Sequence, residues 1–160
     1  MAKNTKTNAM RQLEKFNIEY EEIEYDLEGK FKSAADVAKK THLDPGHMLK
    51  TLATISKSNN INIYVIPADE TLDMKKCAKI AGEKSISILP TKNLKKEVGY
   101  QRGETTALAM KQDFPIFIEK SVENFPYVII SGGKKGISIK LNPKDFAKAS
   151  SGIFGDLIQW

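Results

Sequence analysis

The sequence predicts a mixed α/β domain, and three observations carry this prediction. Strand-like and helix-like segments alternate over the first two thirds of the chain. Segments 57–60 and 132–136 are polar or glycine-rich and lie between strand-like runs, which is typical of β-hairpins. The 160 residues, 41% hydrophobic and 28% charged, suit one domain over 1–160. We therefore expect a mixed, largely antiparallel sheet or partial barrel flanked by helices.

The N-terminal part predicts a helix, a strand and a second helix. Residues 5–16 favour a helix because apolar residues recur every three positions on one face. Residues 20–25 favour a strand. Ser33, followed three residues later by Asp36, resembles a capping box and predicts a helix that runs toward His42.

The middle of the chain predicts a hairpin and three further elements. Apolar and polar residues alternate in 61–67, which indicates a strand, and its hairpin partner is 48–56. A helix over 72–81, which Gly82 is placed to end, a short strand over 86–89 and a helix over 93–98 follow.

The C-terminal part predicts a second hairpin and two helices. Its strands are 127–131 and 137–141, and 132–136 is the glycine-rich loop between them. An asparagine, a proline and an aspartate at cap spacing open a helix over 142–148. A last short helix is expected to carry Phe154, Leu157 and Ile158 onto the core.

Lys50 is unusual because it places a charge inside the apolar run 48–56. Residues two apart share a face of a strand, so Lys50 should project from the same side as Met48 and Leu52. Burying an ammonium group without a partner is costly. Such a lysine therefore either extends to the rim of the domain or meets an anion at a site, and the strand alone leaves both interpretations open.

The sequence lacks the marks of the common enzyme classes. It contains no GxSxG turn, Walker A loop, dinucleotide fingerprint or HExxH. The single cysteine, Cys77, is expected to be a buried apolar residue. His42 and His47 lack a Cys, Asp or Glu pattern of metal-ligand spacing, so we expect no metal and no cofactor. No stretch reaches transmembrane length and no signal peptide is evident, so we expect a cytoplasmic protein without a membrane partner.

The net charge of +5 comes from 25 basic residues, of which only Arg11 and Arg102 are arginine. Lysine is a hydrated point charge, which favours attraction to a phosphate backbone over reading of bases. A solvated lysine-rich surface explains the same composition, and the two interpretations have equal weight.

Two glycine-containing segments, 99–103 and 131–136, are candidates for a site with Lys50. Consecutive glycines such as Gly132 and Gly133 let backbone amides approach an anion or a polarised carbonyl closely. A plain tight turn is the simpler explanation of each segment taken alone.

Four segments follow one another in an order that is informative. They are Met48-Leu49-Lys50-Thr51-Leu52, then Leu72-Asp73-Met74-Lys75-Lys76-Cys77-Ala78-Lys79, then Gly99-Tyr100 with Gly103, and Ile130-Ser131-Gly132-Gly133-Lys134-Lys135-Gly136. In this order they resemble the YbaK family of aminoacyl-tRNA deacylases, which also occurs as the editing insert of bacterial prolyl-tRNA synthetases. The resemblance covers nearly the whole chain. It implies a YbaK-like fold and a free-standing hydrolase that removes a wrong amino acid from the 3′ end of transfer RNA.

The resemblance also implies roles for individual residues. The essential lysine of the family, part of a Lys-Thr pair, matches Lys50 followed by Thr51. In the cysteine-removing members the thiol of the substrate attacks its own ester, which would explain a hydrolase without a nucleophile. Lys50 would then position the terminal phosphate or ribose while amides polarise the ester carbonyl. The pocket around the aminoacyl-adenosine end would be formed by Tyr25, Gly103, Ser131, Gly132 and Gly133.

The chain departs from the family pattern at three positions. Glu104 stands where many relatives have glycine, and Ala107 replaces a rigid proline. Ser138 stands where relatives often have an aspartate just after the glycine loop. These changes bear on the amino acid that the pocket accepts and on whether the pocket is active.

The sequence thus favours an enzyme that deacylates Cys-tRNA(Pro), with Ala-tRNA(Pro) as the alternative substrate. Its expected partner is aminoacylated transfer RNA, with prolyl-tRNA synthetase as a candidate second partner. A small pocket cannot strongly reject cysteine or alanine by packing alone, so synthetase errors of this kind require editing. Two other functions stay open: a non-catalytic module that binds transfer RNA or its synthetase, with the pocket closed by Glu104, and a regulatory domain that binds a small molecule or free amino acid.

Overall fold

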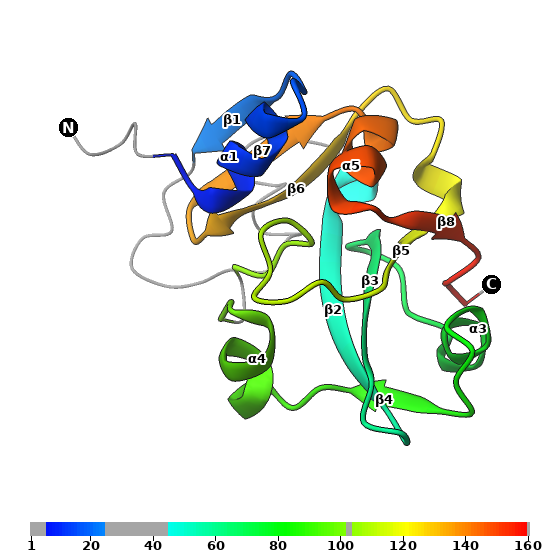
Figure 1. Cartoon of the computed structure of the whole chain (residues 1–160). Coiled ribbons are helices and arrows are strands. Elements are labelled where there is room, and N and C mark those ends of the chain that lie inside the picture. Colours follow the sequence, from blue (N-terminus) through cyan, green and yellow to red (C-terminus); the bar gives the residue numbers. More distant parts are fainter. Residues whose placement is uncertain (1–5, 25–44, 102–103, 160) are drawn as a thin grey trace.

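Two β-sheets and four helices make up the computed structural model of the chain, which describes residues 6–24, 45–101 and 104–159 (Figure 1). The strands are β1 (Glu21–Glu24), β2 (Leu49–Ser56), β3 (Ile61–Pro67), β4 (Ile86–Ile88), β5 (Ile116–Glu119), β6 (Val128–Lys134), β7 (Ile137–Leu141) and β8 (Ile153–Gly155). The helices are α1 (Asn8–Lys15), α3 (Met74–Ile80), α4 (Thr91–Val98) and α5 (Pro143–Ser150), with short 3₁₀ turns at Pro45–His47 and Lys120–Val122.

The two sheets have the strand orders β1-β7-β6 and β4-β2-β3-β5-β8. The three-stranded sheet is antiparallel throughout. In the five-stranded sheet, β2 pairs antiparallel with β3 and β4, whereas β5 pairs parallel with β3 and β8. The predicted mixed α/β class is therefore confirmed, with two sheets in place of one. The described strands do not close into a barrel.

Local capping explains where three of the helices begin. The Thr7 hydroxyl accepts a hydrogen bond from the backbone N–H of Met10 at the start of α1. Asp73 accepts two backbone N–H bonds at the start of α3, each 3.0 Å long. Asn142 caps α5 in the same way, with Pro143 in the first turn. These helices and the hairpin β2–β3 agree with the sequence prediction, while the predicted helix toward His42 lies outside the described residues.

The main core lies between the two sheets and is covered by α1 and α5. The β2–β3 hairpin buries apolar residues on both faces, because a second cluster forms against α3 on the opposite side. The main cluster includes Met10, Leu13, Ala53, Ile63, Val65, Ile130, Ile139 and Phe146, and the second includes Tyr64, Ile66, Cys77, Phe117 and Leu157. Phe16, although apolar, is 39% exposed just beyond α1.

The predicted C-terminal helix is wrong, because the segment forms strand β8 instead. β8 pairs parallel with β5, with Phe117 opposite Ile153 and Ile118 opposite Phe154. The open edge of β5 supplies hydrogen-bond partners that no local pattern reveals. The burial expected of Leu157 is nevertheless correct, since it packs in the second cluster.

The predicted extent of the glycine loop, residues 132–136, is also wrong. Gly132 and Gly133 belong to β6, and the turn consists only of Lys135 and Gly136. The β6–β7 register shifts between Ser131, which lies opposite Ser138, and Lys134, which lies opposite Ile137. The two glycines therefore form a β-bulge.

Candidate active site

An isolated β-bridge connects the strand that carries Lys50 with the strand that carries the glycine segment. Met48 forms an isolated parallel bridge with Ile129 of β6. Lys50 and Ser131 each lie two residues further along their strands, on the same faces as the bridged residues. The bridge therefore brings the start of β2, which carries Lys50, against the part of β6 that leads into Ser131.

The Lys50 side chain is half-buried, in register with Ile66 of β3 and on the same face as Leu52. Within the described part of the chain, no carboxylate or carbonyl pairs with its ammonium group. A half-buried cation without such a partner can bind an anionic or strongly polar group of a ligand. Strand alternation places Thr51 on the opposite face, in register with Val65, so the Thr51 side chain does not share this site.

Ser131 connects the glycine bulge to the loop that follows α4. Its hydroxyl donates a hydrogen bond to the backbone carbonyl of Glu104 at 2.8 Å. The same hydroxyl accepts a hydrogen bond from the backbone N–H of Gly133 at 3.2 Å. Ser131 thus fixes the shape of both segments, which is a positioning role.

Packing requires glycine at position 132 of the bulge, and the backbone conformation favours glycine at position 133. A Cβ atom at Gly132 would lie 2.7 Å from Cγ2 of Ile137 and 3.1 Å from its carbonyl oxygen. Gly133 has a φ of +92°, and a Cβ there would contact the ring of Tyr100 at 3.5 Å. The bulge therefore keeps backbone groups uncovered by side chains beside Lys50.

Two of the three departures from the family pattern, Glu104 and Ser138, lie beside this bulge. The backbone of Glu104 is held by Ser131, and no described residue donates a hydrogen bond to its carboxylate. Ala107 is buried in the main core, and Ser138 is buried opposite Ser131. Two further residues proposed for the pocket, Tyr25 and Gly103, lie outside the described residues.

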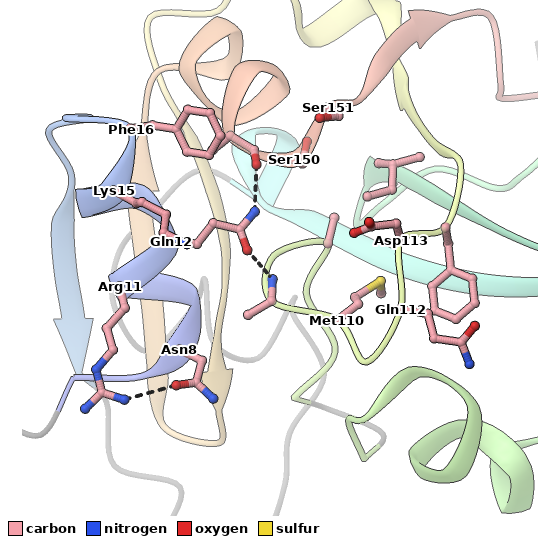
Figure 2. Close-up of a pocket in the computed structure, with 15 residues that line it drawn as sticks. Asn8, Arg11, Gln12, Lys15, Phe16, Met110, Gln112, Asp113, Ser150 and Ser151 are labelled. Atoms are coloured by element: carbon pink, nitrogen blue, oxygen red, sulfur yellow. Dashed lines mark hydrogen bonds between the residues drawn. The ribbon is translucent and has the colours of Figure 1, made fainter.

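Two side chains that the sequence analysis did not single out support the loop after α4. Tyr100 donates its hydroxyl to the carbonyl of Leu108 at 2.6 Å, and burial, followed by the Glu104 carboxylate, raises its pKa to about 12. Gln12 of α1 accepts from the backbone N–H of Ala109 at 2.7 Å and donates to the carbonyl of Ala149 at 2.6 Å (Figure 2). A glutamine between the buried Met10 and Leu13 was the only signal of this link in the sequence.

Neither Cys77 nor His47 contributes to this site. The Cys77 thiol is buried under α3, 3.4 Å from the carbonyl of Leu157, and burial raises its pKa to about 12. The ring of His47 stacks on Tyr127, and its Nδ1 lies 2.9 Å from the Tyr127 carbonyl. Among the described residues no cluster of three His, Cys, Asp or Glu side chains could hold a metal ion. No described helix is long and apolar enough to cross a membrane.

The free energy of unfolding should decrease at alkaline pH because the Cys77 thiol and the Tyr100 hydroxyl are buried. Burial raises the pKa of Cys77 from 9.0, and that of Tyr100 from 10.0, to about 12. Above about pH 9 the unfolded chain loses protons that the folded chain keeps, so the free energy of unfolding decreases as pH rises toward 12. Urea titrations from about pH 8 to 11 measure this fall. It should be shallower in Cys77→Ala, and an equal slope in both proteins would contradict the assignment to Cys77.

Comparison with known proteins identifies the family of this chain. The sequence profile of the aminoacyl-tRNA editing domain matches residues 28–149. The chain belongs to this family. It is 34% identical, over 95% of its own length and 93% of the relative's, to an Enterococcus faecalis protein named as a candidate Cys-tRNA(Pro)/Cys-tRNA(Cys) deacylase, EbsC.

Solved structures support the fold of an editing domain. The hypothetical protein APE2540 superposes with a TM-score of 0.86 at 15% identity, covering 96% of this chain and 100% of that protein. A candidate trans-editing enzyme for prolyl-tRNA synthetase superposes with a TM-score of 0.82 at 14% identity, covering 95% and 93%. The family predicted from the four ordered segments is therefore confirmed.

Proposed function

We propose that this editing domain is a trans-acting aminoacyl-tRNA deacylase whose main substrate is Cys-tRNA(Pro). Membership of the editing family and the 34% identity to the relative named as a Cys-tRNA(Pro)/Cys-tRNA(Cys) deacylase support the reaction and the amino acid. The observation that carries the proposal is the half-buried Lys50 ammonium without a described partner, next to the glycine bulge of β6.

In this proposal Lys50 is a binding and orienting group. Its ammonium holds the terminal phosphate or a ribose oxygen of the aminoacyl-adenosine beside the glycine bulge, and so orients the ester. An ester is already activated, so orientation and stabilisation of the developing oxyanion can supply the rate without a nucleophile from the protein.

The bond changes differ between cysteine and alanine. With cysteine, the substrate thiol attacks the carbonyl carbon, a C–S bond forms, the ester C–O bond breaks, and the 3′ oxygen of the transfer RNA takes the thiol proton. Water then opens the thiolactone to free cysteine. Alanine has no thiol, so its ester requires direct attack by water. The cysteine ester therefore needs no nucleophile from the protein, whereas the alanine ester needs an activated water.

The amino-acid preference can be tested by comparing three substrates. Purified protein should release cysteine from Cys-tRNA(Pro) at least about tenfold faster than alanine from Ala-tRNA(Pro), and S-methylcysteinyl-tRNA(Pro) should be stable because its sulfur cannot lose a proton. Equal rates for the cysteine and S-methylcysteine esters would contradict attack by the substrate thiol. Faster release of alanine would reassign the substrate to Ala-tRNA(Pro).

The same proposal includes a cellular setting. Cysteine is attached to tRNA(Pro) by prolyl-tRNA synthetase, so we propose that this editing domain acts in the cytoplasm, on transfer RNA released by or still near the synthetase. Pull-down of prolyl-tRNA synthetase by the tagged protein in the presence of tRNA(Pro) tests whether the two associate.

A further inference from the structure

Two hollows lie side by side along α1. The larger, of about 690 Å³, is bounded by α1, the loop 107–116 and the end of α5 (Figure 2). The smaller, of about 350 Å³, lies at the N-terminal end of α1 and is lined by Tyr100 and Gly133. Both include Asn8 and Ala109 in their walls, so they adjoin each other, and we call the two hollows together the α1 groove. Since Gly133 belongs to the glycine bulge, the groove reaches this bulge.

The walls of the α1 groove are basic. They carry Lys6, Arg11, Lys15 and Lys134 against a single acidic side chain, Asp113. Lys6 pairs with Glu14, whereas the Arg11 guanidinium donates to the side chain of Asn8 at 3.0 Å and lies toward the N-terminal end of α1 (Figure 2). Charge complementarity therefore favours a chain of phosphates as the ligand.

The groove also carries groups that suit nucleotide bases. Phe16 lines its far end and is 39% exposed, although its neighbours on the apolar face of α1 are fully buried. An exposed aromatic ring offers a stacking surface for any base, and such stacking beside basic groups is typical of proteins that bind single-stranded RNA. The amide of Gln112 and the hydroxyl of Ser151 also line the groove, where they can bond to base edges.

We propose that the α1 groove binds the single-stranded nucleotides that precede the aminoacylated terminal adenosine of transfer RNA. This inference rests on the proposed function, because the adenosine itself would occupy the site formed by Lys50 and the glycine bulge. Arg11 and Lys15 then contact phosphates, and Phe16 stacks on a base. The groove confers affinity for transfer RNA and takes no part in the ester chemistry.

The test separates RNA binding from chemistry. Uncharged tRNA(Pro) is titrated against wild type, Arg11→Gln/Lys15→Gln and Phe16→Ala, with filter binding at several salt concentrations. The double variant should bind about tenfold or more weakly, and the slope of log affinity against log salt should fall by about 1.4, because each of the two lost contacts to a single strand contributes about 0.7. Phe16→Ala should also bind at least about fivefold more weakly, with an unchanged salt slope. Hydrolysis of 3′-O-cysteinyl-adenosine, which is too short to reach the groove, should be equal in all three proteins.

A matched control is Lys57→Gln/Lys84→Gln, which removes two exposed lysines from the β2–β3 turn and the segment before β4, at the end of the molecule away from α1 (Figure 1). This control should bind tRNA(Pro) like wild type. Wild-type affinity of the α1 double variant, or an equal loss in the control, would overturn the inference. So would a loss of cysteinyl-adenosine hydrolysis without weaker RNA binding. The binding arm needs no turnover, so it decides the inference even if the proposed hydrolysis fails.

Discussion

Replacing Lys50 by alanine is expected to lower the single-turnover rate of Cys-tRNA(Pro) deacylation by about 100-fold or more while leaving the fold intact. The ammonium of Lys50 is half-buried next to the glycine bulge, and its loss removes the positive group proposed to orient the ester. Removing one preorganised electrostatic contact at a reacting centre typically costs about 10²–10³-fold in rate. Because no described residue pairs with Lys50, its removal leaves no buried partner unsatisfied. Thermal unfolding should therefore be close to wild type.

Two variants on the same hairpin control this result. Lys50→Arg keeps the charge with a different shape and should recover part of the rate. Lys57→Ala removes an exposed lysine from the other end of β2 and should deacylate like wild type. Wild-type turnover in Lys50→Ala would rule out the assigned role of this lysine, whatever the substrate.

Replacing Glu119 by alanine is expected to destabilise the protein by about 3 kcal/mol. The side chain is fully buried at the end of β5 and accepts backbone N–H bonds from Ser121 at 2.8 Å and Leu157 at 2.9 Å. Hydrogen bonds to a charged group are worth about 1.5–3 kcal/mol each, and alanine leaves both donors without this acceptor. Urea denaturation measures the free energy of unfolding directly.

The control for this prediction is a second glutamate. Glu19→Ala, at an exposed position before β1, should change stability by less than about 0.5 kcal/mol. Glu119→Gln keeps one acceptor oxygen and should fall between Glu119→Ala and wild type. Equal stability of Glu119→Ala and wild type would contradict a structural role for the two hydrogen bonds.

The elements that the sequence predicts well are those specified by local patterns. The β2–β3 hairpin follows from alternation around a polar turn, the end of α3 from Gly82, and the start of α5 from Asn142 and Pro143. β8 could not be predicted, because its three residues form a strand only through pairing with the distant β5. The bulge at Gly132 and Gly133 likewise depends on contacts with Ile137 and Tyr100. Tertiary contacts thus decide the elements that local patterns miss.

The candidate site is predictable in part for the same reason. Lys50 stands out in the sequence because a charge interrupts an apolar strand, and consecutive glycines mark the bulge. Their proximity depends on the bridge between Met48 and Ile129, which are 81 positions apart (129 − 48) and carry no common motif. The hydrogen bond from Ser131 to the Glu104 carbonyl is invisible to sequence reasoning, because any residue could supply that carbonyl.

The central claim, that this editing domain hydrolyses the ester of a mischarged transfer RNA, is tested most directly by one time course. Cys-tRNA(Pro) carrying labelled cysteine is incubated with excess protein, and the fraction still acylated is followed against a sample without protein. An editing hydrolase should remove all of the label within minutes, well ahead of spontaneous hydrolysis. Decay at the spontaneous rate, with the transfer RNA bound to the protein, would contradict it and would indicate a module that binds transfer RNA without editing it.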